Sequence, residues 1–288
     1  MLRPFQVVTP GTVSEASAEL ERFGDAAKVY AGGSELLLIL RQGLVDYDYL
    51  VNVKGIPELQ ELDWDGQAMQ IGAAVTHRRL ERSKEVGEYL PVLRQAETHV
   101  GNVRVRNVGT LGGNLCFGDP HSDPGTVLLL YDTHVKLANK ASERVLALED
   151  FFVGLYETAL QPDELMVGIR VGPLPQGVAG AYLRMARFER PSLSVAVAAG
   201  ERDGRLHTLR LAVGCAGPVP MRLRELEARL EGTSLEEGQR LVQESGKYLQ
   251  EVLDPVEDLH GSVAYKTYLA GVLLGRGLGQ AVVAGRES

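Results

Sequence analysis

Two pairs of adjacent glycines constrain this sequence more than any other feature. Gly32-Gly33 lies in segment 31–37 (AGGSELL), and Gly112-Gly113 lies in segment 110–114 (TLGGN). Adjacent glycines let the main chain turn with positive φ and let another group approach the backbone closely. The first pair stands between an expected strand and an expected helix, where unpaired N–H groups favour an anion such as a pyrophosphate. Ordinary turn chemistry, with Ser34 as a helix cap, is the alternative.

The second pair continues into a polar stretch that could hold the rest of such a ligand. The Thr110 hydroxyl and the amides of Gly112 and Gly113 could form a nest for phosphate oxygens. Asp123 could accept a hydrogen bond from a ribose or polyol hydroxyl. His121 and Asp123 could instead bind a metal, but no third ligand is spaced to complete that site. Neither pair fits a dinucleotide fingerprint or a phosphate loop, so a Rossmann fold and a Walker-type NTPase are disfavoured.

Hydrophobic periodicity predicts an N-terminal half in two parts. A strand over 28–31, a helix over 35–41 and a strand over 49–53 form a small β-α-β unit, which ends at the Gly55-Ile56-Pro57 break. The second part is predicted to contain strands over 68–75, 135–137 and 165–171, helices from about 77 and over 91–99, and a helix-like segment at Phe151-Phe152. The stretch 101–123 is predicted to be a long loop with short extended pieces, and such ordered loops tend to be functional.

A linker rich in proline and glycine, Gly172 to Gly177 (GPLPQG), predicts a domain boundary. Beyond it the pattern predicts strands over 181–185, 192–202 and 205–213, the last two joined by an Asp203-Gly204 hairpin turn. Amphipathic helical patterns follow over 222–230, 235–253 and 262–274, the second capped by Ser234. These signals predict a separate α+β C-terminal domain.

Composition limits the function classes. The formal net charge of −8 argues against a nucleic-acid partner, because such proteins need a clustered basic surface. No apolar run approaches the ~20 residues that span a bilayer, and no export signal is visible, so a cytoplasmic protein without a membrane span is expected. The two cysteines, Cys116 and Cys215, are expected to be buried apolar thiols. Arg104 and Arg106 could pair with phosphate or belong to a solvated face.

Three motifs in this order resemble the FAD-binding medium subunit of the molybdenum hydroxylases, the xanthine dehydrogenase and carbon monoxide dehydrogenase family. They are AGGSELL (31–37), NVGTLGGNL with DPHSD (107–123), and FFVGLYETALQPDELM (151–166). The resemblance covers essentially the whole chain. It implies an α+β fold: a two-subdomain FAD-binding domain of the vanillyl-alcohol-oxidase (PCMH) type (1–55 and 56–173), then a C-terminal domain (178–288) with a three-stranded antiparallel sheet and helices.

In that family the flavin lies between the two N-terminal subdomains, with its pyrophosphate at the glycine loops. The resemblance therefore implies a set of cofactor-binding residues here: Val29, Tyr30, Ala31, Gly32, Gly33, Ser34, Glu35, Leu36, Val100, Thr110, Leu111, Gly112, Gly113, Asn114, Asp123, Met166 and Arg184. Asp123 matches an aspartate that contacts the ribityl region. Met166 and Arg184 depart from the usual leucine and lysine. The resemblance implies no catalytic side chain and no metal ligand, and the cysteine-bearing insertion of some relatives is missing.

The resemblance implies an oxidoreductase subunit that relays electrons. A large partner subunit carries the molybdopterin cofactor, a small one carries two-iron iron–sulfur clusters, and FAD on this chain passes the electrons to an external acceptor. The expected assembly is a dimer of heterotrimers. Two alternatives stand beside it: a free-standing FAD-dependent oxidoreductase of the enolpyruvylglucosamine reductase or aryl-alcohol oxidase type, and a cofactor-free assembly or binding module.

Overall fold

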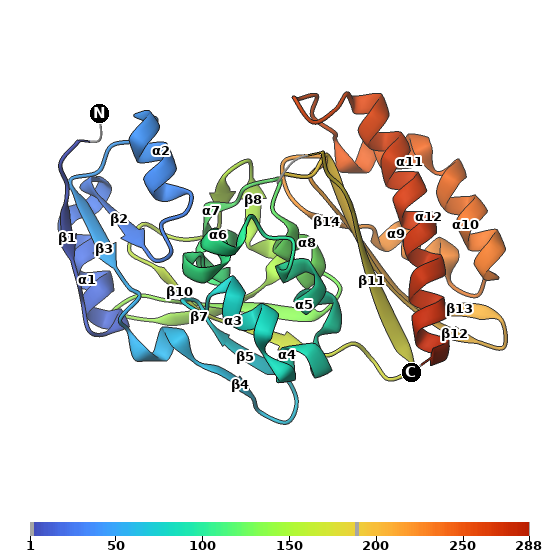
Figure 1. The fold of residues 1–288 in the computed structure, drawn as a ribbon, viewed down its shortest axis with the longest axis horizontal. Coiled ribbons are helices and arrows are strands. Elements are labelled where there is room, and N and C mark those ends of the chain that lie inside the picture. Colours follow the sequence, from blue (N-terminus) through green and yellow to red (C-terminus); the bar gives the residue numbers. More distant parts are fainter. Residues whose placement is uncertain (1–2, 188–189, 288) are drawn as a thin grey trace.

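The computed structural model describes residues 3–187 and 190–287. Its elements form three units in chain order, each around its own sheet (Figure 1). The first unit has a parallel sheet in the order β1-β3-β2 and two helices. Its elements are β1 (Gln6–Val8), α1 (Val13–Phe23), a 3-10 turn (Gly24–Ala26), β2 (Ala27–Tyr30), α2 (Leu36–Gln42) and β3 (Tyr49–Asn52). The predicted β-α-β unit is present, because strand β2, helix α2 and strand β3 follow one another as expected.

The second unit has a five-stranded antiparallel sheet in the order β4-β5-β10-β6-β7. The strands are β4 (Leu62–Trp64), β5 (Met69–Gly72), β6 (Asp132–Ala138), β7 (Glu143–Ala147) and β10 (Leu165–Gly172), with a hairpin of β8 (Phe152–Gly154) and β9 (Glu157–Thr158). The helices are α3 (His77–Arg82), α4 (Lys84–Tyr89), α5 (Pro91–Glu97), α6 (Val103–Val108), α7 (Leu111–Phe117) and α8 (Asp123–Leu128), with 3-10 turns at Pro57–Gln60 and Leu148–Asp150. Buried apolar side chains from the sheet and the helices share one core.

The prediction of a long loop over 101–123 is wrong, because α6, α7 and the start of α8 occupy it. Side-chain caps start two of these helices: the Asn102 carboxamide oxygen accepts from the amides of Arg104 and Val105, and the Thr110 hydroxyl oxygen accepts from Gly113. Both helices are short and glycine or valine rich, which hides the helical period. The prediction of a helix-like segment at 151–152 is also wrong, since strand β8 begins at Phe152.

The third unit has an antiparallel sheet of four strands rather than the expected three: β11 (Val178–Met185), β12 (Leu193–Arg202), β13 (Arg205–Gly214) and β14 (Met221–Arg222). Strand β14 has only two residues, too few for an alternating pattern. The helices are α9 (Arg224–Leu230), α10 (Leu235–Glu244), α11 (Gly246–Leu253) and α12 (Val263–Glu287). The predicted helix over 235–253 is therefore two helices, which meet at Ser245, and Ser234 caps α10 as expected.

Helix α12 is long and apolar enough to cross a membrane by length and composition alone, but 56% of that window is buried inside the fold. It lies along β11 and β12 (Figure 1). Its side chains at Ala270, Leu274 and Leu278 are fully buried in the core of the third unit. This packing is that of a core helix.

Strand β12 fixes the third unit against the second. Val195 and Val197 on one face pack in the core with α12, while Ala196 and Ala198 on the other face pack in the core of the second unit. The strand reads as a continuous apolar run because both of its faces are buried. On the side of the second unit, helix α5 contacts β11, and helix α8 contacts β12 and β13.

Candidate functional site

The two glycine segments lie against each other at the contact between the first and second units. A Cβ on Gly32 would lie 2.4 Å from the carbonyl oxygen of Val108 and 2.6 Å from the Cα of Gly109. A Cβ on Gly109 would in turn lie 3.3 Å from the Ser34 hydroxyl oxygen. The main chain at Gly32 thus contacts the main chain at Val108 and Gly109 directly, and only glycine fits at position 32. We call residues 31–36 the first glycine loop and residues 109–114 the second glycine segment.

The first glycine loop has main-chain donors without acceptors. In the part of the chain that the structure describes, the amides of Gly32, Gly33, Ser34 and Glu35 donate no hydrogen bond. The Ser34 hydroxyl is buried and has no partner there either, although each buried polar group normally needs one. Gly33 has φ +71°, and a Cβ on it would meet the Tyr30 ring at 2.5 Å. A run of free amides beside a buried hydroxyl suits the oxygens of an anionic ligand.

The second glycine segment differs, because its amides are already occupied. The Leu111 amide donates to the Val75 carbonyl at 3.0 Å, Gly112 donates to the Ala73 carbonyl at 3.0 Å, and Gly113 donates to the Thr110 hydroxyl at 3.0 Å. The predicted nest is therefore wrong in its donors. The first two bonds hold the start of helix α7 against the turn that follows strand β5, and what remains for a ligand is the Thr110 hydroxyl hydrogen and the open side of Gly113.

Asp123 and Arg184 come together from different units. The Arg184 guanidinium lies 3.4 Å from the Asp123 carboxylate and donates to the carbonyl of His99 at 3.1 Å, beside Val100. Burial raises the pKa of Asp123 to about 6, although Arg184 and hydrogen bonding with Tyr182 oppose that rise. Such a carboxyl changes protonation close to neutral pH, so it can accept from or donate to a ligand hydroxyl.

The other predicted residues frame this contact. Val29 and Tyr30 end strand β2 just before the first glycine loop, which Leu36 closes at the start of α2. The Asn114 carboxamide oxygen accepts from the Ser122 hydroxyl at 2.6 Å, which ties α7 to the residue before Asp123. Met166 is buried in β10 with its side chain in the core of the second unit, so it forms part of the floor below α7.

A buried pair that the sequence analysis did not single out supports the second glycine segment. His77 Nδ1 lies 2.7 Å from Glu97 Oε2, and both side chains are buried. The His77 amide donates to the Gly109 carbonyl at 3.1 Å, and the second carboxylate oxygen of Glu97 has no partner among the described residues. Nothing in the helical patterns around these positions marks either residue, since their proximity depends on how α3 and α5 pack.

Two further candidates, Arg106 and His121, have structural partners. Arg106 donates to the Glu81 carboxylate at 3.0 Å and to the carbonyls of Val100 and Gly101, so it is not a solvated residue, whereas Arg104 is exposed. His121 contacts Asp258 and the Pro191 carbonyl, and the described residues contain no cluster of three His, Cys, Asp or Glu that could hold a metal. Burial raises the pKa of the Cys116 thiol to about 12.

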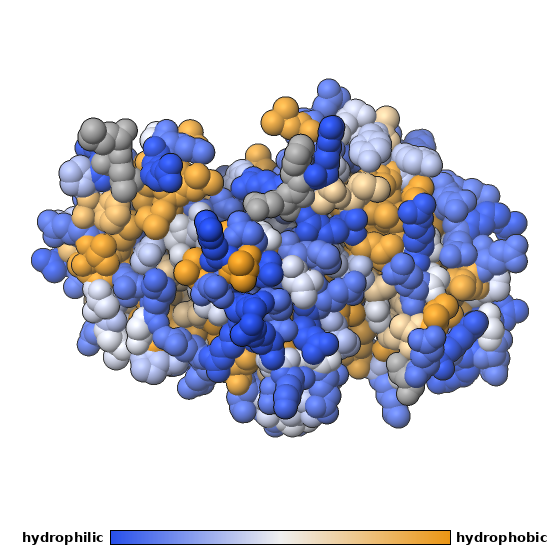
Figure 2. Space-filling view, in the orientation of Figure 1, coloured by the Kyte–Doolittle hydropathy of each residue, from blue (hydrophilic) through white to orange (hydrophobic). Residues whose placement is uncertain are grey.

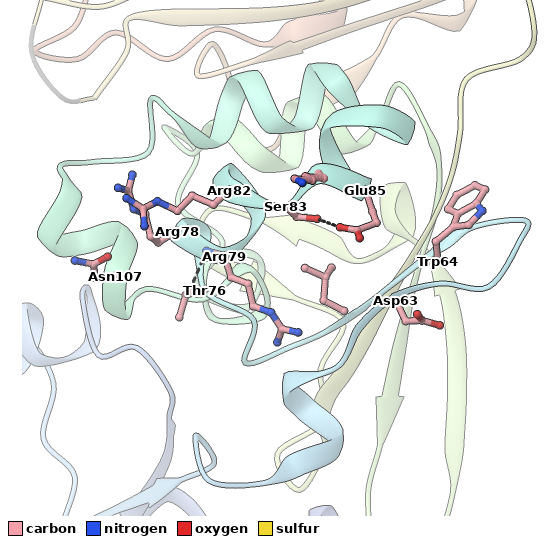
Figure 3. A pocket seen from close by; sticks show the side chains of 11 residues that line it. Asp63, Trp64, Thr76, Arg78, Arg79, Arg82, Ser83, Glu85 and Asn107 are labelled. Atoms are coloured by element: carbon pink, nitrogen blue, oxygen red, sulfur yellow. Dashed lines mark hydrogen bonds between the residues drawn. The ribbon is translucent and has the colours of Figure 1, made fainter.

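A separate open groove of about 860 Å³ lies beside α3 and strand β4 (Figure 3). It is lined by Arg78, Arg79, Arg82 and Lys84, yet Arg78 pairs with Glu81 and Arg79 donates to the Gln60 carbonyl. No residue predicted to bind the cofactor lines this groove. The candidate site is therefore the contact between the glycine segments, not this groove.

Comparisons with known proteins agree over the full length of the chain. Residues 3–175 match the family described as "FAD binding domain in molybdopterin dehydrogenase", and residues 184–281 match "CO dehydrogenase flavoprotein C-terminal domain". The chain is 30% identical to the carbon monoxide dehydrogenase medium chain of Hydrogenophaga pseudoflava, with 96% of each chain covered. It is also 30% identical to a putative xanthine dehydrogenase FAD-binding subunit of Escherichia coli, covering 90% of this chain and 89% of that one.

Solved structures give the same result. Carbon monoxide dehydrogenase from Hydrogenophaga pseudoflava superposes with a TM-score of 0.93 at 31% identity, with 99% of each chain covered. Quinoline 2-oxidoreductase from Pseudomonas putida superposes with a TM-score of 0.92 at 25% identity, again with 99% of each chain covered. The similarity thus includes all three units and their arrangement.

Proposed function

This chain belongs to the molybdopterin dehydrogenase family as an FAD-binding medium subunit, and we propose that it holds FAD at the contact between its two glycine segments. There the flavin relays electrons from the iron–sulfur clusters of a partner subunit to an external acceptor. The chain is thus an oxidoreductase subunit. The observation that carries the placement is the run of free amides from Gly32 to Glu35 beside the buried, unpartnered Ser34 hydroxyl.

The residues of this contact fit the chemical groups of FAD. The free amides of the first glycine loop and the Thr110 hydroxyl suit pyrophosphate oxygens. The Asp123 carboxyl, held beside Arg184, suits ribityl hydroxyls, and Val100 and Met166 complete the walls of the site. FAD itself supplies the redox chemistry when it is bound. The chain's own residues bind it, orient it and exclude water, so no side chain here needs to act as a general acid or base.

The proposed partners follow from the relatives, which are named as medium chains or subunits of larger enzymes. We propose a large subunit with the molybdopterin cofactor, a small subunit with two-iron clusters, a dimer of heterotrimers and a cytoplasmic location. Figure 2 shows apolar surface over the first unit, where Val7, Leu38 and Leu44 are exposed, and exposed apolar patches often mark interfaces. We also propose the three-part division 1–55, 56–173 and 178–288.

Purification of the native complex tests this function. We expect FAD, iron and molybdenum to elute with this chain in gel filtration, and the bound flavin to be reduced when the substrate of the molybdenum subunit is added. Elution of the chain alone, as a flavoprotein that oxidises a substrate without partners, would favour the free-standing oxidoreductase. Elution without any flavin would favour a cofactor-free module.

A further inference from the structure

An arginine of the third unit bridges the first glycine loop and the second unit. The Arg190 guanidinium lies 3.0 Å from the Asp119 carboxylate and 3.4 Å from the carboxylate of Glu35, the residue that ends the run of free amides. Burial raises the pKa of the Tyr156 phenol, Asp119 raises it further, and hydrogen bonding to Arg190 opposes the rise, so Tyr156 faces the same guanidinium. Three segments far apart in sequence therefore meet on one side chain.

The backbone beside Arg190 is itself held in place. His121 Nδ1 lies 2.9 Å from the Pro191 carbonyl oxygen, and His121 Nε2 lies 3.0 Å from the Asp258 carboxylate. The buried Lys266 ammonium donates to that carboxylate at 2.8 Å. Asp258 and His121 thus anchor Pro191, and with it the neighbouring Arg190.

The charges of Arg190, Glu35 and Asp119 favour an arrangement in which the three side chains stay together. Burial lowers the pKa of Arg190, but the charges of Asp119 and Glu35 raise it overall, so the guanidinium stays ionised. Glu35 and Asp119 belong to different units and would repel each other without a cation between them. The Arg190 and Glu35 side chains are 42% and 39% exposed, so each ion pair alone adds little to overall stability. The two ion pairs instead fix the position of the first glycine loop relative to the second unit, because Glu35 belongs to that loop and follows Ser34 directly.

We propose that Arg190 is a positioning residue that clamps the first glycine loop against the second unit and thereby slows the release of FAD. The inference rests on the proposed function, since it takes FAD as the ligand of the loop. Arg190 acts through Glu35 and Asp119. The clamp joins the loop from the side of helix α2, while the contact of Gly32 with Val108 and Gly109 joins it from the other side.

Release of FAD from the purified chain into an excess of a scavenging apoflavoprotein, followed by flavin fluorescence, tests the clamp. Arg190→Gln should release FAD about three- to tenfold faster, the range expected for two partly exposed ion pairs. Arg190→Lys keeps the charge and should stay within about twofold of the wild type. Arg224→Gln is the matched control, because Arg224 of the third unit pairs with Glu149 of the second unit at 2.7 Å, as Arg190 does with Asp119, but away from the loop.

A double variant and a flavin-free measurement complete the test. In the background of Glu35→Gln, the change Arg190→Gln should accelerate release less than it does alone, because the two residues share one interaction. In the flavin-free chain, Arg190→Gln should speed hydrogen exchange of the amides of Leu37 and Ile39, which donate to the carbonyls of Gly33 and Glu35 in the loop, and Arg224→Gln should not. Release from Arg190→Gln at the wild-type rate, or equal acceleration by Arg224→Gln, overturns the clamp. A wild-type chain that binds no FAD overturns the proposed function, and the exchange comparison then still decides whether the clamp exists.

Discussion

Asp123 of the proposed site is a buried carboxyl whose burial lowers the stability of the fold. Its side chain is buried beside Arg184, which also donates to the carbonyl of His99. A buried carboxylate loses its hydration, and a single ion pair at 3.4 Å does not recover that loss. The sequence indicated Asp123 from its place in a polar motif, but it named Arg184 only through a resemblance. Their contact depends on how β11 of the third unit docks on α8, which no local pattern records.

The raised pKa of Asp123 predicts a pH dependence of stability. The pKa rises from 3.8 to about 6 on folding, so the folded chain binds more protons than the unfolded chain between these values. The free energy of unfolding of the flavin-free chain should therefore fall as pH rises from about 4 to 7, by up to ~3 kcal/mol from this residue.

Urea titrations of wild type and Asp123→Asn at several pH values measure this contribution. The variant should lack this part of the pH dependence and should be relatively more stable at pH 7 than at pH 4, while it binds FAD more weakly. Parallel pH profiles for the two proteins would contradict the assigned burial of the carboxyl.

At the scale of elements, helix α7 explains what the second glycine segment does. The sequence identified Gly112 and Gly113 as one motif, but the structure gives them different roles. A Cβ on Gly112 would lie 2.5 Å from the Cβ and 2.6 Å from the carbonyl oxygen of Ala73, whereas a Cβ on Gly113 would meet only the Thr110 hydroxyl oxygen, at 2.8 Å. Gly112 thus lets α7 sit close to the turn that follows strand β5, whereas Gly113 is exposed.

Two alanine variants separate these roles. Gly112→Ala should destabilise the chain by about 1–3 kcal/mol, the usual cost of overpacking. Gly113→Ala should change stability by less than about 1 kcal/mol, because the better helix propensity of alanine offsets the strain on the Thr110 cap. Gly113→Ala should nevertheless weaken FAD binding, since its methyl group fills the open side of the segment. Thermal unfolding and FAD titration of both variants measure this, and equal effects of the two substitutions on both quantities would contradict the assignment.

Some helices and strands could be predicted from local sequence patterns alone. Strands β2, β3 and β10, helix α2 and the hairpin of β12 and β13 follow periodicity and turn chemistry, and all were predicted. Helices α6 and α7 were missed because their start signals, Asn102 and Thr110, precede segments with little helical period. The donors of the predicted nest were misassigned for a related reason: the acceptor of the Gly112 amide, Ala73, lies far away in the sequence, in the turn after strand β5.

At the scale of the whole molecule, the residues of the proposed site come together only because three units meet. The first glycine loop comes from the first unit, Asp123 from the second and Arg184 from the third. The contact of Gly32 with Val108 and Gly109 joins the first two, and the doubly buried strand β12 joins the last two. The linker at 172–177 predicted separate domains. How these domains dock could not be predicted, because their contacts join residues far apart in the sequence. Similarity to medium chains over the full length extends this arrangement to the relatives.

Hydrogen exchange of the purified chain with and without FAD tests the central claim most directly. FAD should bind with one molecule per chain and should slow the exchange of the amides from Gly32 to Glu35, because these donors are free in the structure. The amides of Gly112 and Gly113, already bonded within the chain, should change much less. Binding of FAD without any protection at Gly32 to Glu35, or no binding at all, would contradict this account.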